Sequence, residues 1–441
     1  MLTIPKKLLL GSATAATQIE GGDLNSNWYH WSLAGKIANN ESSIVAADHY
    51  NRYPEDIQIM SELNQEIYRM SIEWSRIEPV KGVWSQEGID HYKDEMAMLL
   101  KNGIQPLVTL HHFSCPEWLQ KEGAWVNSDT VERFLIFTGK VVLELGNMVS
   151  EYCTINEPNV FAMDTYMDAK YPPGHKDDIK SYFKASKNLI VAHLRAYKLI
   201  HNIRAEHKFS GITKVGIAHH LAHFEVDSKN PLTHLSKKLM DYSFHDLFTK
   251  GMIEGKLSMP LGVGYPEGKG RFCDFIGVNY YSRHIIRSTM NPSMLFGEVT
   301  VDESVPDSRK NDLGWEIYPK GLSIILKKLY KDYPLPIYIT ENGIPDVNDT
   351  KRAQFIYEHL KELVTLIEEG IDIRRYYHWS LLDNLEWNDG YGPRFGLVEV
   401  NYNTLKRTIR QSGKFYGELI KHRHISKEMK QTYNIKDVSY E

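Results

Sequence analysis

Residues 336–382 read PIYITENGIPDVNDTKRAQFIYEHLKELVTLIEEGIDIRRYYHWSLL and contain two β-rich runs separated by a helical segment. The first run is Pro336 to Thr340, and the second is Arg375 to Leu382. The segment from Lys351 to Gly370 places its apolar residues on one helical face: Ile356, Leu360, Leu363 and Ile367. Strand, helix and strand in this order form the unit from which parallel sheets are built.

A second helix is predicted from Gln86 to Gly103, where four apolar residues recur at helical spacing: Ile89, Met96, Leu99 and Leu100. Gly103 stands in the position expected of a C-cap. For the helix in residues 351–370, Asp349 or Thr350 can cap the start. Both segments are therefore long amphipathic helices with recognisable ends.

The chain contains eight β-rich runs, and segments with helical periodicity lie between most of them. The runs are Leu8–Ala16, Glu66–Ile72, Gln105–His112, Tyr152–Asn156, Lys214–Phe224, Phe275–Tyr281, Pro336–Thr340 and Arg375–Leu382. No low-complexity tract or Pro/Gly/Ser linker divides the chain. We therefore predict an α/β protein with one (β/α)8 TIM barrel and elaborated βα loops, comprising residues 1–441 as a single catalytic domain. The longest irregular stretch, Ser288 to Leu313, is expected to rim the site.

The composition fits a soluble globular protein of ordinary charge. The chain has 441 residues, of which 42% are hydrophobic and 24% charged, and its formal net charge is -4. This weak net charge creates no strong field, which argues against nucleic acid and anionic membranes as partners. An α/β barrel can reach this length as one domain.

The three cysteines point to a reducing compartment. Cys115, Cys153 and Cys273 are odd in number and show no C-x-x-C spacing, so no disulfide framework is expected. Lys6 to Leu10 superficially resembles the start of a signal peptide, but its apolar run is too short, and we interpret it as leading into the first barrel strand. No run approaches the roughly 20 apolar residues of a membrane span. We expect a cytoplasmic protein without a membrane span, and its oligomeric state stays open.

Polar and aromatic residues gather near the carboxyl ends of the predicted strands. They are Gln18, Arg69, His111, His112, Asn156, Glu157, Asn279, Tyr281, Glu341 and Trp379. In a parallel barrel these strand ends meet on one face, where the active sites of this fold lie. The sequence thus predicts one site built from all parts of the chain.

Two of these residues, Glu157 and Glu341, can act as a pair of carboxylates. Cleavage of a glycosidic bond needs one group to protonate the leaving oxygen and a second to attack or to activate water. The acid must keep its proton near neutral pH, for which a nearby carboxylate and an apolar wall are required, and Trp379 and Trp387 can supply that wall. An attacking carboxylate must be ionised and so needs a cation or a donor beside it. A single glutamate at a strand end more often caps a helix or forms a surface ion pair, so the pairing carries the prediction.

Short motifs along almost the whole chain resemble those of the glycoside hydrolase family 1 β-glycosidases. Besides Asn156-Glu157-Pro158 and Thr340-Glu341-Asn342-Gly343, they occur at residues 11–21, 68–77, 109–113, 277–281, 314–319, 379–387 and 394–398. The resemblance implies a retaining β-glycosidase, most consistent with a β-glucosidase, which removes terminal β-D-glycosyl residues through a covalent glycosyl-enzyme. No cofactor and no metal are expected, and the partner is a small β-glycoside or short oligosaccharide.

The resemblance also implies roles for individual residues. Glu157 matches the acid/base and Glu341 the nucleophile, with their carboxyl groups about 5 to 5.5 Å apart. Arg69 and Tyr281 match the two groups that hold the nucleophile. Asn156 matches the residue that hydrogen-bonds the sugar 2-hydroxyl. Further substrate-binding positions are Gln18, His112 and Glu386 for the other hydroxyls, Trp379 as the sugar platform, Trp315 as the aglycone wall, and Asn279, Trp387 and Phe395.

The chain departs from the family pattern at three places. Residues 113–116 read Phe-Ser-Cys-Pro where Trp-Asp-Leu-Pro is common, which removes an indole donor and bears on sugar preference. Residues 164–167 replace a Gly-Tyr turn, so the leaving-group subsite is expected to differ. Glu73 stands where serine is common, and we interpret it as a buried, paired carboxylate without a catalytic role. Five apolar side chains suggest either a leaving-group site for alkyl or aryl glycosides or ordinary core: Phe161, Met163, Tyr166, Met167 and Trp315.

The residues of the chain argue against other functions of the same fold. A 6-phospho-β-glucosidase would need cationic and hydroxyl donors, whereas this chain has Glu386 and no lysine from Asn384 to Val400, with Arg394 read as a structural ion-pair partner. A thioglucosidase without the acid would carry glutamine in place of Glu157, and a non-catalytic sugar-binding protein would have lost one glutamate.

Three histidines lie close together in the sequence, but they do not predict a metal site. His219, His220 and His223 are ordinary packing and surface histidines in our interpretation, because neighbours on a strand point to different faces. Preference for glucosides, galactosides or fucosides stays open at this level.

Overall fold

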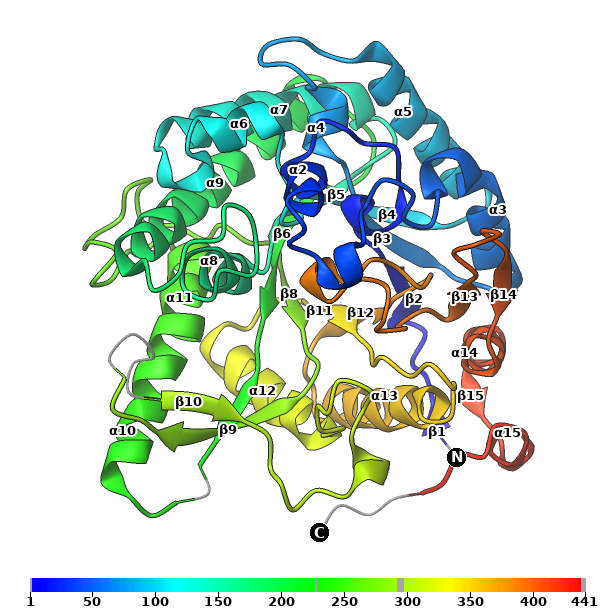
Figure 1. Cartoon of the computed structure of the whole chain (residues 1–441). Coiled ribbons are helices and arrows are strands. Elements are labelled where there is room, and N and C mark those ends of the chain that lie inside the picture. The colour runs from blue at the N-terminus through cyan, green and yellow to red at the C-terminus, as the bar shows by residue number, and fades with distance from the viewer. Residues whose placement is uncertain (1, 227, 292–296, 438–441) are drawn as a thin grey trace.

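Eight parallel strands form the centre of the molecule. The computed structural model describes residues 2–226, 228–291 and 297–437, and in this part of the chain the strands close into a barrel in the order β11-β12-β2-β3-β4-β5-β6-β8 (Figure 1). The strands are β2 (Leu9–Ala13), β3 (Ile67–Ser71), β4 (Gln105–His111), β5 (Glu151–Asn156), β6 (Lys214–His220), β8 (Phe275–Asn279), β11 (Ile337–Asn342) and β12 (Ile373–Trp379). The prediction of a (β/α)8 barrel is confirmed.

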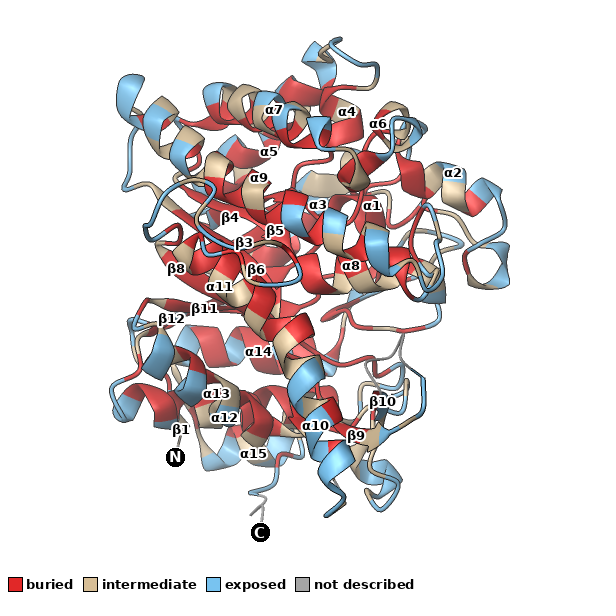
Figure 2. Ribbon diagram, turned by 90° about the vertical axis from the view of Figure 1, so that its left-hand side faces the viewer, coloured by how far each residue is buried: buried red, intermediate tan, exposed pale blue. Residues whose placement is uncertain are grey.

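A ring of long helices surrounds the barrel, and most of the intervals between successive strands contain one. These helices are α3 (His49–Glu62), α5 (Gln86–Lys101), α7 (Asp129–Leu145), α9 (Ile179–Glu206), α11 (Leu247–Glu254), α12 (Pro319–Asp332), α13 (Arg352–Glu368) and α14 (Gln411–His422). Each turns an apolar face inward, and Figure 2 shows exposed residues on the outer faces of the helices and buried residues in the strands. In α5, the buried residues include Ile89, Met96 and Leu99, and the Ser85 hydroxyl caps the first turn.

Short elements elaborate the loops that follow the carboxyl ends of the strands. The short helices are α1 (Ala16–Ile19), α2 (Asn27–Leu33), α4 (Trp74–Ile77), α6 (Glu117–Lys121), α8 (Pro158–Tyr166) and α10 (Pro231–Met240), with α15 (Lys427–Thr432) near the end of the chain. Three small sheets add β7 (His223–Glu225) with β9 (Arg283–Ser288) and β10 (Gly297–Thr300), β13 (Val398–Val400) with β14 (Arg407–Ile409), and β1 (Leu2–Thr3) with β15 (His424–Ile425). Most of this additional structure therefore lies on the face where the predicted site residues converge.

Close packing of the barrel constrains the motif around Glu341. One contiguous hydrophobic cluster extends from Ile4 to Ile435, and every residue of β3, β5 and β11 is buried. Gly343 follows β11, and a Cβ atom there would lie 1.7 Å from the carbonyl oxygen of Trp379. Only glycine fits, which explains the last residue of the Thr340-Glu341-Asn342-Gly343 motif.

Three local predictions were wrong. The run Lys214 to Phe224 is not one strand, because β6 ends at His220 and β7 pairs with β9 in a separate sheet. Neither Asp349 nor Thr350 caps α13; the carboxylate of Asp346 accepts the first free backbone N–H groups instead.

The third concerns the stretch Ser288 to Leu313, which is not irregular throughout. Its described residues include β10, which pairs antiparallel with β9, and a short 3-10 helix, Asp307–Arg309. Residues 292–296 lie outside the described part of the chain.

The three cysteines are buried and unpaired. Among the described residues, no helix combines the length and the apolar character that crossing a bilayer requires.

Candidate active site

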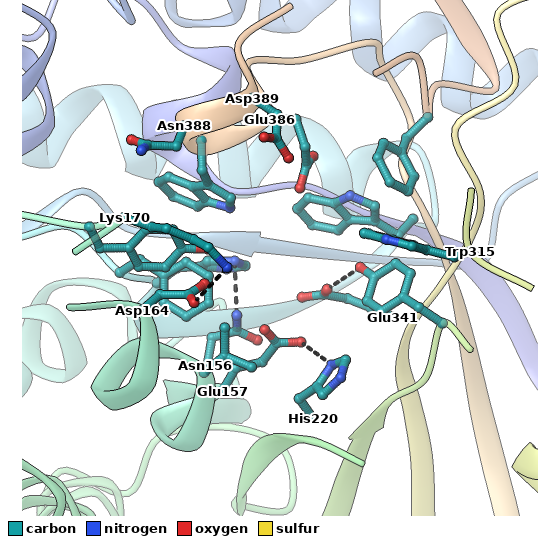
Figure 3. A pocket seen from close by; sticks show the side chains of 18 of the residues that line it. Asn156, Glu157, Asp164, Lys170, His220, Trp315, Glu341, Glu386, Asn388 and Asp389 are labelled. Carbon is teal, nitrogen blue, oxygen red and sulfur yellow. Dashed lines mark hydrogen bonds and ion pairs between the residues drawn. The ribbon is translucent and has the colours of Figure 1, made fainter. Parts of the chain in front are cut away.

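A cavity of about 390 Å³ opens at the carboxyl ends of the barrel strands. Its lining includes most of the side chains predicted from the sequence: His112, Asn156, Glu157, Tyr281, Trp315, Glu341, Trp379, Glu386, Trp387 and Phe395. Gln18, Arg69 and Asn279 are fully buried behind this lining. Figure 3 shows the side chains of Glu157, Glu341 and Glu386 directed toward the same space.

Glu341 stands at the end of β11 with a donor on each carboxyl oxygen. Arg69 Nη1 lies 2.6 Å from Oε1, and the Tyr281 hydroxyl donates to Oε2 at 2.6 Å. Burial raises the pKa of Glu341 to about 7 against the lowering effect of Arg69, and the neighbouring Glu157 carboxylate adds to the rise. The predicted nucleophile thus has the cation and the donor that the sequence argument required, within a strongly desolvated setting.

Glu157 lies at the junction between β5 and α8, in a backbone conformation that glutamate rarely adopts. Its φ is 41° and its ψ 59°, in the left-handed region, and Pro158 follows as the first residue of α8. Such backbone strain costs of the order of 1–3 kcal/mol and is typical of functional sites. Its Oε1 accepts from Asn279 Nδ2 at 2.8 Å and lies 3.3 Å from His220 Nδ1. The tight turn and these contacts direct the carboxyl group into the cavity.

Arg69 connects several strands below the cavity. Its guanidinium contacts Glu341 on β11, Asn156 Oδ1 on β5 at 2.7 Å and Thr109 Oγ1 on β4 at 3.1 Å. Asn279 Nδ2 donates to the same Asn156 oxygen at 3.0 Å. The orientation of the Asn156 amide is therefore fixed by two donors.

His112 is oriented by the same amide. Asn156 Nδ2 lies 2.9 Å from His112 Nε2, so that nitrogen accepts and the ring proton resides on Nδ1. Burial, with the charge of Arg69, lowers the pKa of His112 well below its ordinary value. His112 Nδ1 has no protein partner among the described residues. A neutral ring with one unused N–H can donate to a bound hydroxyl group.

Glu386 forms the opposite wall together with Gln18. Gln18 Nε2 donates to Asn384 Oδ1 at 2.9 Å and lies 3.4 Å from Glu386 Oε2, while Gln18 Oε1 has no protein partner among the described residues. Burial raises the pKa of Glu386 to about 8, with added effects of Asp389, Glu341 and Glu157. This wall offers both a hydrogen-bond donor and an acceptor to a ligand.

Replacing Glu386 by glutamine should change how stability depends on pH. A carboxyl group whose pKa rises on folding, here from 4.5 to about 8, gives stability below about pH 4.5 that is lost as pH rises through 8. We expect Glu386→Gln to raise the free energy of unfolding at pH 9 by on the order of 2 kcal/mol relative to its effect at pH 5. This change in the free energy of unfolding is smaller than the full pKa shift would give, because the Glu386 carboxyl group faces the cavity.

Urea unfolding at pH 5 and pH 9 measures this difference. Glu206→Gln, at the exposed end of α9, is the matched control and should change stability equally at both pH values. An effect of Glu386→Gln that is the same at both pH values would contradict the raised pKa.

The aromatic residues of the lining pack around the two walls. The rings of Trp379 and Trp387 lie 5.9 and 5.8 Å from His112, each inclined by 27°. Phe113, which replaces the usual tryptophan, also lines the cavity and packs edge-on against Trp387 at 5.1 Å. The cavity therefore presents an apolar band between its polar groups.

Glu73, Arg394 and two of the five apolar candidates belong to the structure that supports the site. Glu73 is buried and accepts hydroxyl hydrogen bonds, with Thr17 at 2.6 Å and Ser114 at 2.8 Å. Arg394 contacts Asp383 at 3.3 Å, as an ion-pair partner outside the cavity lining. Phe161 and Tyr166 are core residues, 3% and 1% exposed.

Several lining residues were not predicted from the sequence as site residues: Asp164, Lys170, Tyr171, His220, Ser282, His284, Asn388 and Asp389. Lys170 follows α8 and its Nζ lies 3.4 Å from Asp164 Oδ1 (Figure 3). His220 was missed because the predicted β-rich run continues to Phe224, whereas the strand ends at His220. Asp164 lies in α8, and Lys170 lies in the loop after that helix, whose path no motif indicates.

The histidines near β6 do not gather around one point. His219 is buried, His220 faces Glu157, and His223 pairs with Glu225. The described residues contain no group of three or more His, Cys, Asp or Glu side chains arranged to hold a metal ion.

A (β/α)8 barrel with two carboxylates facing one cavity, one of them held by an arginine and a tyrosine, defines the class of glycoside-cleaving enzymes. Comparison with known proteins identifies the family. The model of glycosyl hydrolase family 1 matches residues 1–425, and the chain belongs to this family.

The chain is similar to its relatives over nearly its whole length. It is 37% identical to the β-glucosidase A of Acetivibrio thermocellus over 95% of this chain and 98% of that enzyme. The structure of a β-glycosidase from Pyrococcus horikoshii matches with a TM-score of 0.90 at 36% identity, covering 99% of both chains. A β-glucosidase from Thermotoga maritima in complex with glucoimidazole matches with a TM-score of 0.87 at 32% identity, covering 96% of this chain and 100% of that one. The protein is a glycosidase.

Proposed function

We propose that this protein is a retaining β-glucosidase with Glu157 as acid/base and Glu341 as nucleophile. The observation that carries the proposal is the unequal setting of the two carboxyl groups. Glu341 receives the Arg69 guanidinium and the Tyr281 hydroxyl, whereas Glu157 faces the cavity beside Asn279 and His220. The guanidinium and the hydroxyl beside Glu341 favour its ionised form, which an attacking carboxylate needs, and Glu157 is then the group placed to give a proton to the leaving oxygen.

In the first step, an oxygen of Glu341 attacks the anomeric carbon and forms a glycosyl ester. The bond to the leaving oxygen breaks at the same time, and Glu157 gives its proton to that oxygen, so the aglycone departs as a neutral alcohol. Arg69 and Tyr281 orient the attacking carboxylate.

In the second step, Glu157, now a carboxylate, takes a proton from water as the water oxygen attacks the anomeric carbon. The ester bond to Glu341 breaks, and the sugar leaves with the β-configuration it had in the substrate. Both glutamates return to their starting states, so the cycle consumes only the glycoside and one water molecule.

The other residues support the sugar in this scheme. The amide of Asn156, fixed by Arg69 and Asn279, binds the 2-hydroxyl as positive charge develops in the transition state. Gln18, His112 and Glu386 bind the remaining hydroxyls, Trp379 and Trp387 form the platform, and Trp315 and Phe395 lie on the leaving-group side. Asn279 acts through Glu157 and Asn156 in this scheme, because its amide is engaged by Asn156, Glu157 and Thr340.

Glucose is the sugar best supported at the non-reducing end. The relatives from Acetivibrio thermocellus and Thermotoga maritima are β-glucosidases, and they match over nearly the whole chain. A 6-phosphorylated sugar is disfavoured by the charges of the described lining. Five acidic residues line the cavity, namely Glu157, Asp164, Glu341, Glu386 and Asp389, while Lys170 is the one lysine there and no arginine is present. Bringing a phosphate among these carboxyl groups is electrostatically costly.

A panel of nitrophenyl glycosides should reveal this preference directly. We expect kcat/KM for the β-glucoside to exceed that for the 6-phospho-β-glucoside by at least about a hundredfold, since a closely placed like-charge pair costs several kcal/mol. Proton NMR during hydrolysis of the β-glucoside should show β-glucose as the first product. A preference for the phosphorylated substrate, or α-glucose appearing first, would overturn the assignment.

The galactoside and fucoside arms of the same panel test the alternatives. Galactose differs from glucose at the 4-hydroxyl, which the wall of Gln18 and Glu386 is placed to bind in this proposal. Higher kcat/KM for β-galactoside or β-fucoside would reassign the sugar and leave the mechanism in place.

A further inference from the structure

Glu73 connects three segments of the chain through its carboxyl group. It lies between β3 and α4, is 2% exposed, and its backbone N–H donates to the Tyr92 hydroxyl at 3.0 Å. The Thr17 hydroxyl donates to Oε2 at 2.6 Å, and the Ser114 hydroxyl lies 2.8 Å from Oε2 and 3.0 Å from Oε1. The Ser75 hydroxyl lies 2.9 Å from Oε1. One buried side chain therefore joins α1, the segment after β4, and α4.

The partners of this carboxyl group are unusual for a buried charge. In the described part of the chain, three hydroxyl groups and no basic side chain contact it. Burial raises the pKa of Glu73, the charge of Asp23 adds to the rise, and the hydroxyl donors oppose it. Each hydroxyl has a single proton to donate, so each contact fixes the orientation of that side chain. The carboxyl group therefore sets the spacing of the segments that it joins.

The first of these segments contains Gln18. Thr17 and Gln18 are consecutive residues of α1, which has four residues, all of them buried. A helix this short has little stability of its own, so contacts with other segments must hold it. Two such contacts come from the region of β3, where Ser71 Oγ accepts from the Ala16 N–H at 2.8 Å and Glu73 accepts from Thr17. Loss of the Thr17 contact would therefore allow Gln18 to shift.

The second segment contains His112, two residues before Ser114. Phe113, between them, has a φ of 68°, in the left-handed region. Backbone strain of this kind persists only where the surrounding structure imposes it. Trp28 Nε1 donates to the carbonyl oxygen of Phe113 at 3.3 Å, and the Ser114 hydroxyl contacts Glu73. Glu73 therefore helps to hold the turn that presents His112 to the cavity.

Glu73 and Ser114 are also two positions at which the chain departs from the family pattern. That pattern has a serine where Glu73 stands and an aspartate where Ser114 stands. The structure brings the two side chains into contact at 2.8 Å. The chain thus keeps one carboxyl group and one hydroxyl group at this pair of positions, with their places exchanged.

We propose that Glu73 is a positioning residue that sets the distance between the segments of Gln18 and His112, and that it has exchanged roles with residue 114 relative to the family pattern. This inference rests on the proposed β-glucosidase function, in which Gln18 and His112 bind hydroxyls of the same sugar. Both side chains must reach one sugar ring, and a displacement of about 1 Å can lower a rate about a hundredfold. Glu73 lies outside the described cavity lining and acts through the two segments.

The preference for a sugar that has all its hydroxyl groups tests the positioning role. The readout is the ratio of kcat/KM for nitrophenyl β-glucoside to that for each of its 3-deoxy, 4-deoxy and 6-deoxy analogues. Loss of folded enzyme lowers both values equally and leaves each ratio unchanged. A misplaced side chain lowers the ratio, because a hydroxyl that is no longer bound can be removed at little cost.

Three variants should lower particular ratios. We expect Glu73→Ser to lower the 4-deoxy ratio about tenfold or more and Thr17→Val about threefold or more, because Gln18 is placed to bind the 4-hydroxyl. Ser114→Ala should lower by about threefold or more the ratio for the hydroxyl that His112 binds, which His112→Ala identifies as the ratio that it lowers most.

A double variant tests the exchange of roles. Glu73→Ser/Ser114→Asp moves the carboxyl group to residue 114, and we expect all ratios to return to within about threefold of those of the unmodified enzyme, because the effects of residues in contact are not additive. Glu362→Ser is the matched control. It removes a carboxyl group that accepts from the Ser323 hydroxyl between α12 and α13, and it should leave every ratio unchanged.

The possible failures are distinct. Unchanged ratios in both Thr17→Val and Ser114→Ala would overturn the positioning role, and these two small changes keep the test valid if Glu73→Ser fails to fold. A double variant that does not fold, or whose ratios stay as low as those of Glu73→Ser, would overturn the exchange of roles. The unmodified enzyme would still hydrolyse nitrophenyl β-glucoside in each of these cases, whereas absence of that hydrolysis would overturn the β-glucosidase function itself.

Discussion

Replacing Glu341 by glycine should reduce kcat for nitrophenyl β-glucoside by at least about a thousandfold. The substitution removes the carboxylate that forms the glycosyl ester, while the acid and the sugar-binding residues stay in place. It also leaves a space beside Arg69 and Tyr281, whose donors held the carboxylate. Azide or formate can occupy this space and should restore part of the turnover.

The product of the rescued reaction identifies the step that was lost. Azide attacking from the position of Glu341 performs a single displacement, so the expected product is α-glucosyl azide, seen by NMR. Glu206→Gly, at the exposed end of α9, is the control for loss of a carboxylate elsewhere and should retain full activity. Turnover of Glu341→Gly close to that of the unmodified enzyme would contradict the nucleophile assignment.

Replacing Glu157 by alanine should separate substrates by the quality of their leaving groups. General acid catalysis contributes roughly 10²- to 10⁴-fold, and a leaving group that departs easily needs little of it. We expect the rate of the first step to fall about a hundredfold or more for alkyl β-glucosides and less than about tenfold for 2,4-dinitrophenyl β-glucoside. Comparing kcat/KM isolates this step for both substrates, because kcat/KM reports only the steps up to formation of the glycosyl ester, whereas kcat also includes the second step, which loses its base.

The configuration of the product formed with azide also tests the role of Glu157. In Glu157→Ala the nucleophile Glu341 remains, so azide enters in the second displacement and should give β-glucosyl azide, opposite in configuration to the product from Glu341→Gly. Equal losses for activated and unactivated substrates would contradict the acid role. A product of α-configuration would do the same.

Much of the fold was predictable because its signals are local. Parallel barrel strands are buried on both sides and read as apolar runs, and the helices between them show one apolar face, as α5 and α13 do. The strand ends could then be placed on one face without further information. Most of the predicted side chains do line one cavity, although Gln18, Arg69 and Asn279 lie behind it.

What escaped prediction depends on contacts between distant segments. The end of β6 at His220 is set by pairing with β8, and β7 continues into a different sheet, so an apolar run alone did not show the break. The carboxylate of Asp346 serves α13 in place of the residues next to its start. Lys170 reaches the cavity through the path of the loop after α8, which carries no motif.

The pKa values of the buried carboxyl groups in the cavity could not be predicted from the sequence either. The sequence indicated which glutamate should be ionised, but burial also shifts the pKa of carboxyl groups in ways that no motif predicts, Glu341 and Glu386 among them. It raises the pKa of Glu341 to about 7 and that of Glu386 to about 8. Both values depend on the shape of the enclosed space and on the separation of the charges.

The position of Arg69 has a consequence for how such an enzyme can diversify. Its guanidinium fixes the nucleophile and the Asn156 amide from beneath the cavity, through residues of β3, β4, β5 and β11. The rim of the cavity, by contrast, includes loop residues such as Lys170, Trp315 and Phe395, none of which hydrogen-bonds to Arg69 or Glu341 in the described part of the chain. Mutations in those loops can therefore alter which aglycones are accepted, while the barrel residues keep the bond-breaking chemistry unchanged.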